Sequence, residues 1–172
     1  MEILLDRITI EEKESLLKAT PEELELSLDL AALNSDVEFR VRLSRVENEV
    51  FLNGTVNFDL KFSCARCLDE FYRHFAVPMN LVIKLVPAEQ ISDEDATEDE
   101  FILYPLSRDA YNLDRQVRDL ISLEVPMKPL CREDCAGLCP QCGTNLNENR
   151  CDCRRSEVDP RWEGLSKLND AN

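Results

Sequence analysis

Histidine and glycine are scarce in this chain of 172 residues, and their scarcity argues against several kinds of active site. His74 is the only histidine, and its place on the outward phase of an alternating segment indicates a solvent-facing residue rather than a base or a ligand. The four glycines form no Gly-rich phosphate loop, and no nucleophile with a base and no carboxylate pair at a recognisable spacing is found. We therefore expect a protein that is not an enzyme and has no small-molecule substrate.

Long apolar runs are also missing. The chain has none of the length needed to cross a bilayer. Its first residues contain Glu2 and an apolar run of only three residues, unlike a secretory signal peptide. These features predict a cytoplasmic protein with no membrane partner. In a reducing cytosol, cysteines are expected to be thiolates on a metal rather than disulfides.

Basic residues are outnumbered, with 20 Lys and Arg against 35 Asp and Glu and a net charge of -15. The imbalance lies in residues 1–126, which hold 13 basic and 27 acidic residues, whereas residues 127–172 hold seven and eight. An acidic body repels phosphate backbones, so wrapping of nucleic acid over a wide surface is not expected. Any RNA contact would be local or would go through a protein partner.

Alternation of apolar and polar residues predicts three consecutive antiparallel strands, over residues 37–43, 50–62 and 71–85. Glu47-Asn48 is the expected first turn. Gly54 indicates a bulge in the second strand, and Pro78 indicates an edge position or a bulge in the third. Short strands are expected at residues 3–5 and 101–104.

Helices are predicted around this sheet. Residues 11–19 are expected to form a short helix and Thr20 to Glu23 a helix cap, while the alternating leucines of residues 24–30 leave that segment undecided. A longer helix is expected from Asn112 as its cap to Pro126. Its apolar stripe is Leu113, Val117, Leu120 and Ile121, with Asp114–Arg118 and Arg115–Asp119 as charge pairs four residues apart.

The expected fold class is therefore α+β, an antiparallel meander or partial barrel covered by helices, with a C-terminal cysteine-rich zinc-binding module. We expect an acidic body over residues 1–126, with an acidic loop at about 88–100. The cysteine-rich tail would cover residues 127–172 and end in a short helix that begins at Asp159-Pro160.

Cysteine, in contrast, is abundant: eight residues fall into three groups, namely Cys64 and Cys67, then Cys131, Cys135, Cys139 and Cys142, then Cys151 and Cys153. Cys139-Pro-Gln-Cys142-Gly143 is typical of a zinc knuckle, in which both sulfurs reach one tetrahedral ion. Cys151 and Cys153 project the same way if their segment is extended. We predict one four-thiolate site from Cys139, Cys142, Cys151 and Cys153.

The other four cysteines, Cys64, Cys67, Cys131 and Cys135, could form a second site that fastens the tail to the sheet. The alternative is a single site drawn from the last six cysteines, with Cys64 and Cys67 as free thiols. One or two zinc ions are expected, ahead of an iron–sulfur cluster, a dithiol redox pair or plain buried thiols. A closed four-thiolate site leaves no position for water, so it would build structure rather than hydrolyse a substrate.

Five basic residues near the last cysteines are candidates for contact with RNA or a partner: Arg150, Arg154, Arg155, Arg161 and Lys167. Equally, their charge could balance the negative charge of four thiolates on one zinc ion.

Several motifs together resemble the bacterial YceD family, which also has plastid relatives. They are Cys64-Ala-Arg-Cys-Leu68 after a strand, Leu123-Glu-Val-Pro-Met-Lys-Pro-Leu-Cys131, Cys135-Ala-Gly-Leu-Cys-Pro-Gln-Cys-Gly-Thr-Asn-Leu-Asn147 and Asp159-Pro-Arg-Trp162, within a likeness from about Val37 to Leu168. The resemblance implies a non-enzymatic ribosome biogenesis factor that supports accumulation of large-subunit ribosomal RNA. It would bind a pre-ribosomal large subunit or an assembly protein. Two other functions stay open: a zinc-ribbon adaptor in transcription or another assembly, and a thiol redox protein.

Overall fold

Strands dominate the computed structural model, which describes residues 1–91 and 101–153. The strands are β1 (Glu2–Leu4), β2 (Lys13–Ala19), β3 (Ala31–Leu33), β4 (Val37–Val46), β5 (Glu49–Ser63), β6 (Glu70–Val86), β7 (Ile102–Pro105) and β8 (Ala110–Asn112). Within the described residues, the α-helices are α1 (Pro21–Leu24) and α2 (Asp114–Glu124), and the short 3-10 helices are η1 (Leu5–Arg7) and η2 (Ala88–Gln90). The described part of the chain is therefore mainly β, with fewer helices than the α+β expectation.

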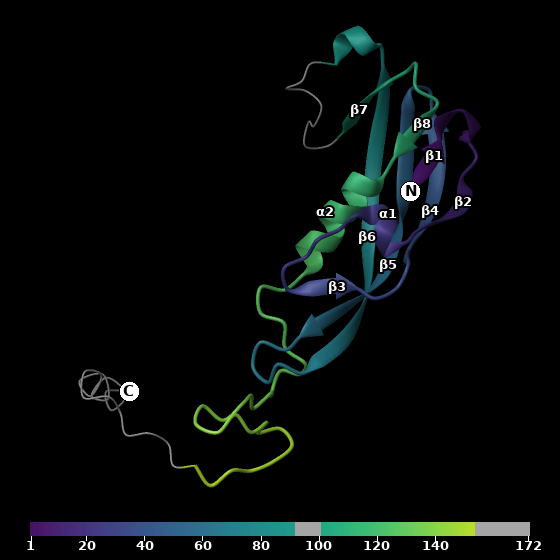
Figure 1. Cartoon of the computed structure of the whole chain (residues 1–172). Helices are drawn as coiled ribbons and strands as arrows, with labels where there is room; N and C mark the ends of the chain where they lie inside the picture. The colour runs from purple at the N-terminus through teal and green to yellow at the C-terminus, as the bar shows by residue number, and fades with distance from the viewer. Residues whose placement is uncertain (92–100, 154–172) are drawn as a thin grey trace, which may run out of the picture.

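The main sheet is built on the predicted meander. Strands β4, β5 and β6 pair antiparallel in sequence order, and the full order is β2-β4-β5-β6-β7 with β3 paired to β5 (Figure 1). Only β7 runs parallel to its neighbour, β6, and β1 and β8 form a separate two-stranded sheet. The sheet is open, since its end strands β2 and β7 are not paired with each other. The meander and the turn at Glu47-Asn48 are confirmed.

The predicted bulge at Gly54 is wrong. Gly54 stays in continuous register, opposite Val41 on β4 and Met79 on β6. Its lack of a side chain serves close packing instead, because a Cβ there would lie 2.1 Å from the carbonyl oxygen of Arg40. Pro78 does lie on a stretch of β6 with one unpaired edge, since β7 covers only Ile83–Val86.

The predicted helix over residues 11–19 is also wrong, because residues 13–19 form the edge strand β2 and pair with β4. Glu, Lys, Leu and Ala favour a helix, but so short a segment gains more from pairing with an existing strand. The cap that follows is confirmed. Thr20 Oγ1 accepts from Glu23 N at 3.3 Å and Glu23 Oε2 accepts from Thr20 N at 2.9 Å, which starts α1.

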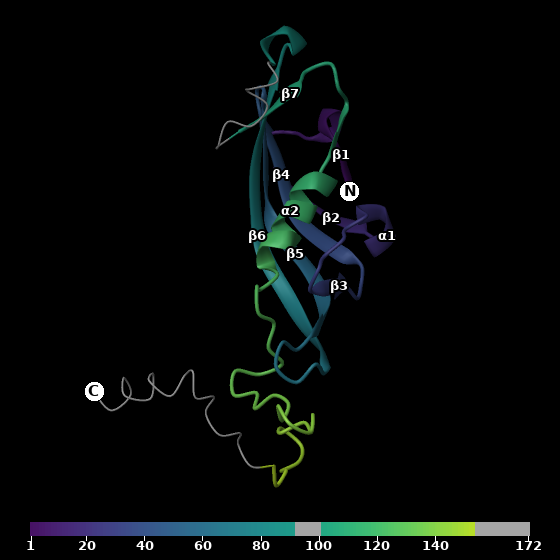
Figure 2. The same ribbon diagram turned by 60° about the vertical axis from the view of Figure 1, so that its left-hand side comes forward.

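Helix α2 packs against one face of the sheet through its predicted apolar stripe. Val117 and Ile121 of this stripe are fully buried. Asn112 Oδ1 accepts from the first helical amide, that of Asp114, at 2.7 Å. The expected Asp114–Arg118 pair does not form: Asp114 binds the amino group of Met1, and Arg118 donates to the carbonyl of Leu24. Figure 2 shows α1 beside the sheet, close to β3.

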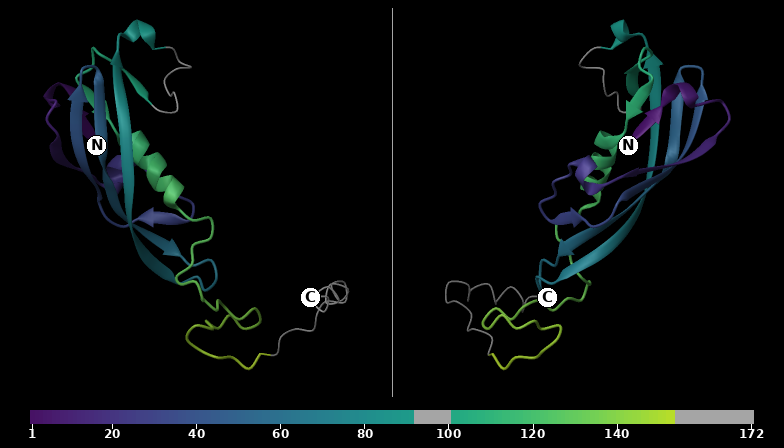
Figure 3. Two further views of the ribbon diagram at one scale, coloured as in Figure 1. Left: turned by 180° about the vertical axis from the view of Figure 1, so that it is seen from behind. Right: turned by 45° about the vertical axis from the view of Figure 1, so that its right-hand side comes forward.

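The hydrophobic core lies between this sheet face and α2, and its buried members fall between Ile3 and Ile121. The β5–β6 hairpin extends past the core, and the cysteine-rich segment lies at its tip (Figures 1 and 3). A second, small buried cluster occurs at that tip. None of the helices within the described ranges is long and apolar enough to cross a membrane. Residues 92–100 of the predicted acidic loop and the helix expected at Asp159-Pro160 lie outside the described residues.

Candidate metal centre

The eight cysteines lie in two groups of four. In each group the four Sγ atoms lie within 4.8 Å of one another. One group, the hairpin site, is Cys64, Cys67, Cys131 and Cys135; the other, the knuckle site, is Cys139, Cys142, Cys151 and Cys153. The grouping is that of the two-site alternative left open by the sequence, and it differs from the alternative in which Cys64 and Cys67 stand apart. Only the knuckle site is made entirely by the C-terminal segment, so the expected C-terminal zinc-binding module contains one of the two groups and not both.

The turn between β5 and β6 supplies the first two thiols of the hairpin site. Cys64 directly follows β5, and its backbone N–H donates to the carbonyl of Asp69 at 2.9 Å, while Leu68 N donates to the carbonyl of Cys64 at 2.9 Å. Leu68 has a φ of 64°, in the left-handed region that residues other than glycine rarely adopt. The tight turn brings Cys64 and Cys67 to one side, and both are buried.

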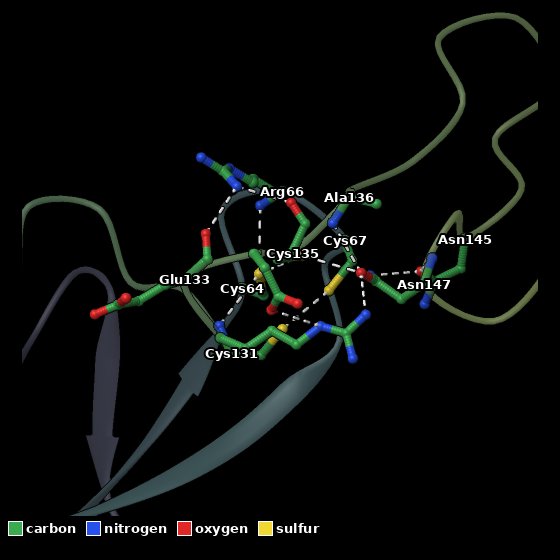
Figure 4. Close-up of polar contacts among 11 residues, drawn as sticks. Cys64, Arg66, Cys67, Cys131, Glu133, Cys135, Ala136, Asn145 and Asn147 are labelled. Carbon is green, nitrogen blue, oxygen red and sulfur yellow. Dashed lines mark hydrogen bonds and ion pairs between the residues drawn. The ribbon is translucent and has the colours of Figure 1, made fainter.

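Backbone hydrogen bonds hold the C-terminal segment against this turn. Ala65 N donates to the carbonyl of Pro129 at 2.8 Å, and Leu138 N donates to that of Arg66 at 3.2 Å. The Arg66 side chain reaches across as well, and its Nη1 donates to the carbonyls of Cys135 at 2.8 Å and Glu133 at 3.2 Å (Figure 4). Cys131 and Cys135 are thus placed opposite Cys64 and Cys67.

Donors around the hairpin site favour thiolates. Cys64 Sγ accepts from the backbone N–H groups of Arg66 and Cys131, each at 3.5 Å. Burial raises the pKa of Cys64, but these N–H groups and that of Cys67 outweigh it and lower the pKa to about 6. At Cys135, burial is likewise outweighed, because the Asn147 amide donates to Sγ at 3.4 Å and the pKa of the thiol is lowered. For Cys67 burial dominates and raises the pKa.

The knuckle site is formed by a tight turn and the extended segment that returns to it. Gly143, with a φ of 73°, lets the chain reverse so that its N–H donates to the carbonyl of Cys139 at 2.9 Å. The Thr144 hydroxyl lies 3.1 Å from Cys142 Sγ, and this contact and the Thr144 N–H lower the pKa of Cys142 to about 6. Cys153 hydrogen-bonds to Cys142, which raises the pKa of Cys153 to about 12. Cys142 and Cys153 are exposed, unlike the thiols of the hairpin site.

The sulfur spacing fits a tetrahedral metal ion. In the hairpin site Cys64 Sγ lies 3.8 Å from Cys135 Sγ, and Cys67 Sγ lies 3.7 Å from Cys131 Sγ. Sulfurs at the corners of a tetrahedron, about 2.3 Å from a central zinc ion, are roughly 3.8 Å apart. Both groups could therefore hold a metal through four thiolates.

Of the five predicted basic contacts, only Arg150 lies in the described residues, where it is exposed. Arg154, Arg155, Arg161 and Lys167 lie outside them. Three site residues had no role assigned from the sequence: Arg66, Asn145 and Asn147. All three stand within the motifs that carry the family resemblance, which is the signal that could have drawn attention to them.

The motifs around both cysteine groups lie in a region that matches a known protein family. Residues 52–169 match the family model described as large ribosomal RNA subunit accumulation protein YceD. An uncharacterized protein of Mycobacterium bovis is 30% identical over 145 residues, which is 83% of this chain and 68% of the relative. No solved structure matches the chain.

Two plant relatives carry a functional name. The large ribosomal RNA subunit accumulation protein YCED homolog 1, chloroplastic, of Arabidopsis thaliana is 25% identical over 154 residues. That of Zea mays is 24% identical over 152 residues. The matches cover 77% and 74% of this chain but only 48% and 50% of the plant proteins.

Proposed function

The chain belongs to the YceD family, named for large ribosomal RNA subunit accumulation, and on this basis we propose that it supports accumulation of large-subunit ribosomal RNA by assisting large-subunit assembly. The match over residues 52–169 is the observation that carries the proposal, because it includes both the sheet hairpin and the cysteine-rich segment. The protein acts by binding a pre-ribosomal large subunit or an assembly protein, without catalysing a reaction, in the cytoplasm.

The charge distribution favours a protein-mediated or local RNA contact. The body formed by residues 1–126 carries 27 acidic and 13 basic residues, so broad contact with a phosphate backbone is electrostatically unfavourable. Residues 127–172 are nearly balanced, with seven basic and eight acidic residues. We place the contact with the particle in this segment, which includes Arg150, Arg154, Arg155, Arg161 and Lys167.

Zinc is the metal that we assign to both cysteine groups. A zinc ion bound to four thiolates has no open coordination position and contributes folding free energy rather than chemistry. At the hairpin site, Cys64 and Cys67 would be joined to Cys131 and Cys135, which fixes the contact segment to the sheet. Elemental analysis of the purified protein should give two zinc ions per chain. If it gave iron and inorganic sulfide instead, the cysteines would hold an iron–sulfur cluster and the assignment of zinc would be wrong.

The ribosomal role can be tested by depleting the protein from the organism whose genome encodes it. We expect the ratio of large-subunit to small-subunit ribosomal RNA to fall and to recover when the wild-type chain is supplied. The variant Cys64→Ser/Cys131→Ser should fail to restore the ratio. Ile10→Ala, which changes a side chain that is 81% exposed and lies outside residues 127–172, is the control and should restore it. An unchanged ratio after depletion would refute the ribosomal role.

Affinity capture identifies the partner. Pre-ribosomal large-subunit particles or an assembly protein should be recovered with the wild-type chain. Recovery of RNA polymerase subunits without ribosomal particles would instead support an adaptor in transcription.

A further inference from the structure

Asn145 and Asn147 lie in the segment that joins Cys142 to Cys151 of the knuckle site, and their side chains form hydrogen bonds toward the hairpin site (Figure 4). Asn147 uses both ends of its amide. Its Oδ1 accepts from Arg132 Nη2 at 2.7 Å and from Ala136 N at 2.8 Å. Its Nδ2 donates to Cys135 Sγ at 3.4 Å and to Asn145 Oδ1 at 2.8 Å. One amide therefore contacts a hairpin-site ligand and the backbone next to that ligand.

Asn145 links the same network to the sheet. Its Nδ2 donates to Asp69 Oδ2 at 2.7 Å, in the turn between β5 and β6. Its Oδ1 also accepts from Asn147 N at 3.1 Å, which fixes the conformation of the segment between them. The two asparagines thus span from the hairpin turn to Cys135.

The knuckle site holds the backbone that presents these asparagines. Leu138 and Asn145 pair as an antiparallel bridge, and Cys139 N donates to the carbonyl of Thr144 at 2.8 Å. The turn that closes this small hairpin, Cys139 to Gly143, contains two of the knuckle thiols. A metal in the knuckle site would therefore fix the hairpin that delivers Asn145 and Asn147.

We propose that Asn147, supported by Asn145, couples the two metal sites: it is a positioning residue for Cys135 that the knuckle site holds in place. Metal in the knuckle site strengthens binding at the hairpin site through this amide, and by linkage the reverse also holds. Groups that hydrogen-bond to metal ligands commonly change metal affinity by about 10- to 100-fold. The inference rests on the proposed metal occupancy of the two sites and not on the ribosomal role.

A purely structural role for Asn147, as a turn residue, makes a different prediction. Asn147→Asp keeps the oxygen that accepts from Arg132 and Ala136, but it replaces the amide donor with an oxygen facing Cys135 and Asn145. If Asn147 only shapes the turn, this change is mild. If its donor positions Cys135, the coupling between the sites is lost.

Cobalt binding to the full chain measures the coupling, because Co²⁺ bound to thiolates absorbs visible light. Competition with a chelator gives the product of the two binding constants in the wild-type chain. Cys142→Ser/Cys153→Ser and Cys131→Ser/Cys135→Ser give the constant of each site alone. We expect the wild-type product to exceed the product of the two single-site constants by about tenfold.

The asparagine variants then assign the coupling. When N147D is introduced into the wild-type chain and into both double-serine variants, the ratio of the two-site product to the product of the single-site constants should fall to within about twofold of one. Asn149→Asp is the matched control: it adds the same charge in the same loop at an exposed residue, and it should keep the tenfold ratio. Asn145→Ala is the second variant, should N147D fold poorly, and it should lose the coupling too.

A ratio near one in the wild-type chain, or equal ratios for N147D and N149D, would overturn the coupling while leaving metal binding intact. Fewer than two bound Co²⁺ ions in the wild-type chain would overturn both the metal assignment and the coupling.

Discussion

Gly54 shows how one residue limits the packing of the sheet. A Cβ at this position would lie 2.1 Å from Arg40 O and 2.8 Å from Val41 Cα, and these backbone atoms cannot move without disturbing β4. We expect Gly54→Ala to lower the free energy of unfolding by about 3 kcal/mol. Urea unfolding followed by circular dichroism measures the change. Asn53→Ala, at the exposed neighbouring position, is the control and should change stability by less than about 1 kcal/mol.

The thiols of the knuckle site should differ in reactivity when metal is removed. The pKa of Cys142 is lowered to about 6 by the Thr144 hydroxyl and N–H, whereas hydrogen bonding to Cys142 raises that of Cys153 to about 12. Since thiolate is the reactive form, Cys142 reacts above pH 6 and loses reactivity as the pH falls through that value. Alkylation with iodoacetamide and peptide mass spectrometry should find Cys142 modified well before Cys153 at pH 7.

Thr144→Val is the control for this assignment. It removes the hydroxyl while keeping the backbone N–H, so alkylation of Cys142 at pH 6 should become slower. Equal rates at Cys142 and Cys153 in the wild-type chain would contradict the pKa difference.

Residue spacing grouped Cys139 with Cys142, but it left the partners of Cys64 and Cys67 open and gave no information on the contacts around the thiols. Two cysteines three apart can share an ion whatever the fold, which is why Cys139 and Cys142 could be grouped from sequence. The Asn147 side chain contacts Cys135 Sγ only because the chain reverses direction between the two residues. Its hydrogen bonds depend on tertiary placement, so no spacing rule could assign them.

At the scale of elements, α2 is held to the sheet by its buried stripe. Ile121 is fully buried in the main core, and Leu123, two residues later, is 85% exposed. Ile121→Ala should lower the free energy of unfolding by about 3 kcal/mol, because it leaves a cavity against the sheet. Leu123→Ala is the matched control, with an expected change within about 0.5 kcal/mol. Urea unfolding curves compare the two, and equal losses would contradict the packing of α2.

Element prediction succeeded where the pattern was long and failed where it was short. Alternation continues through β5, which has 15 residues, and through β6, which has 17, so their type was evident from the sequence. In contrast, β2 has seven residues of helix-favouring composition, and pairing with β4 decides its conformation. Gly54 was misassigned because a glycine in a strand indicates either a bulge or a close approach, and only the register distinguishes them.

At the scale of the whole molecule, the main core and the cysteine-rich tip are stabilised differently. Every buried residue of the main core lies between Ile3 and Ile121. At the tip, the buried cluster consists of Cys64, Cys67 and Cys135, with only a few apolar neighbours. Residues 127–150 are therefore expected to depend on metal for their attachment, while the sheet does not.

Removal of metal with a chelator should release the segment 127–150 and leave the sheet folded. Trypsin should then cut after Arg132 and Arg150, because the metal no longer fixes this backbone. Lys61, within the paired strand β5, is the internal control and should stay uncut. Mass spectrometry of a time course identifies the fragments, and adding zinc back should restore protection. If Lys61 were cut as fast as Arg132 after chelation, the metal would be supporting the sheet itself; if chelation changed nothing, hydrogen bonds alone would hold the tip.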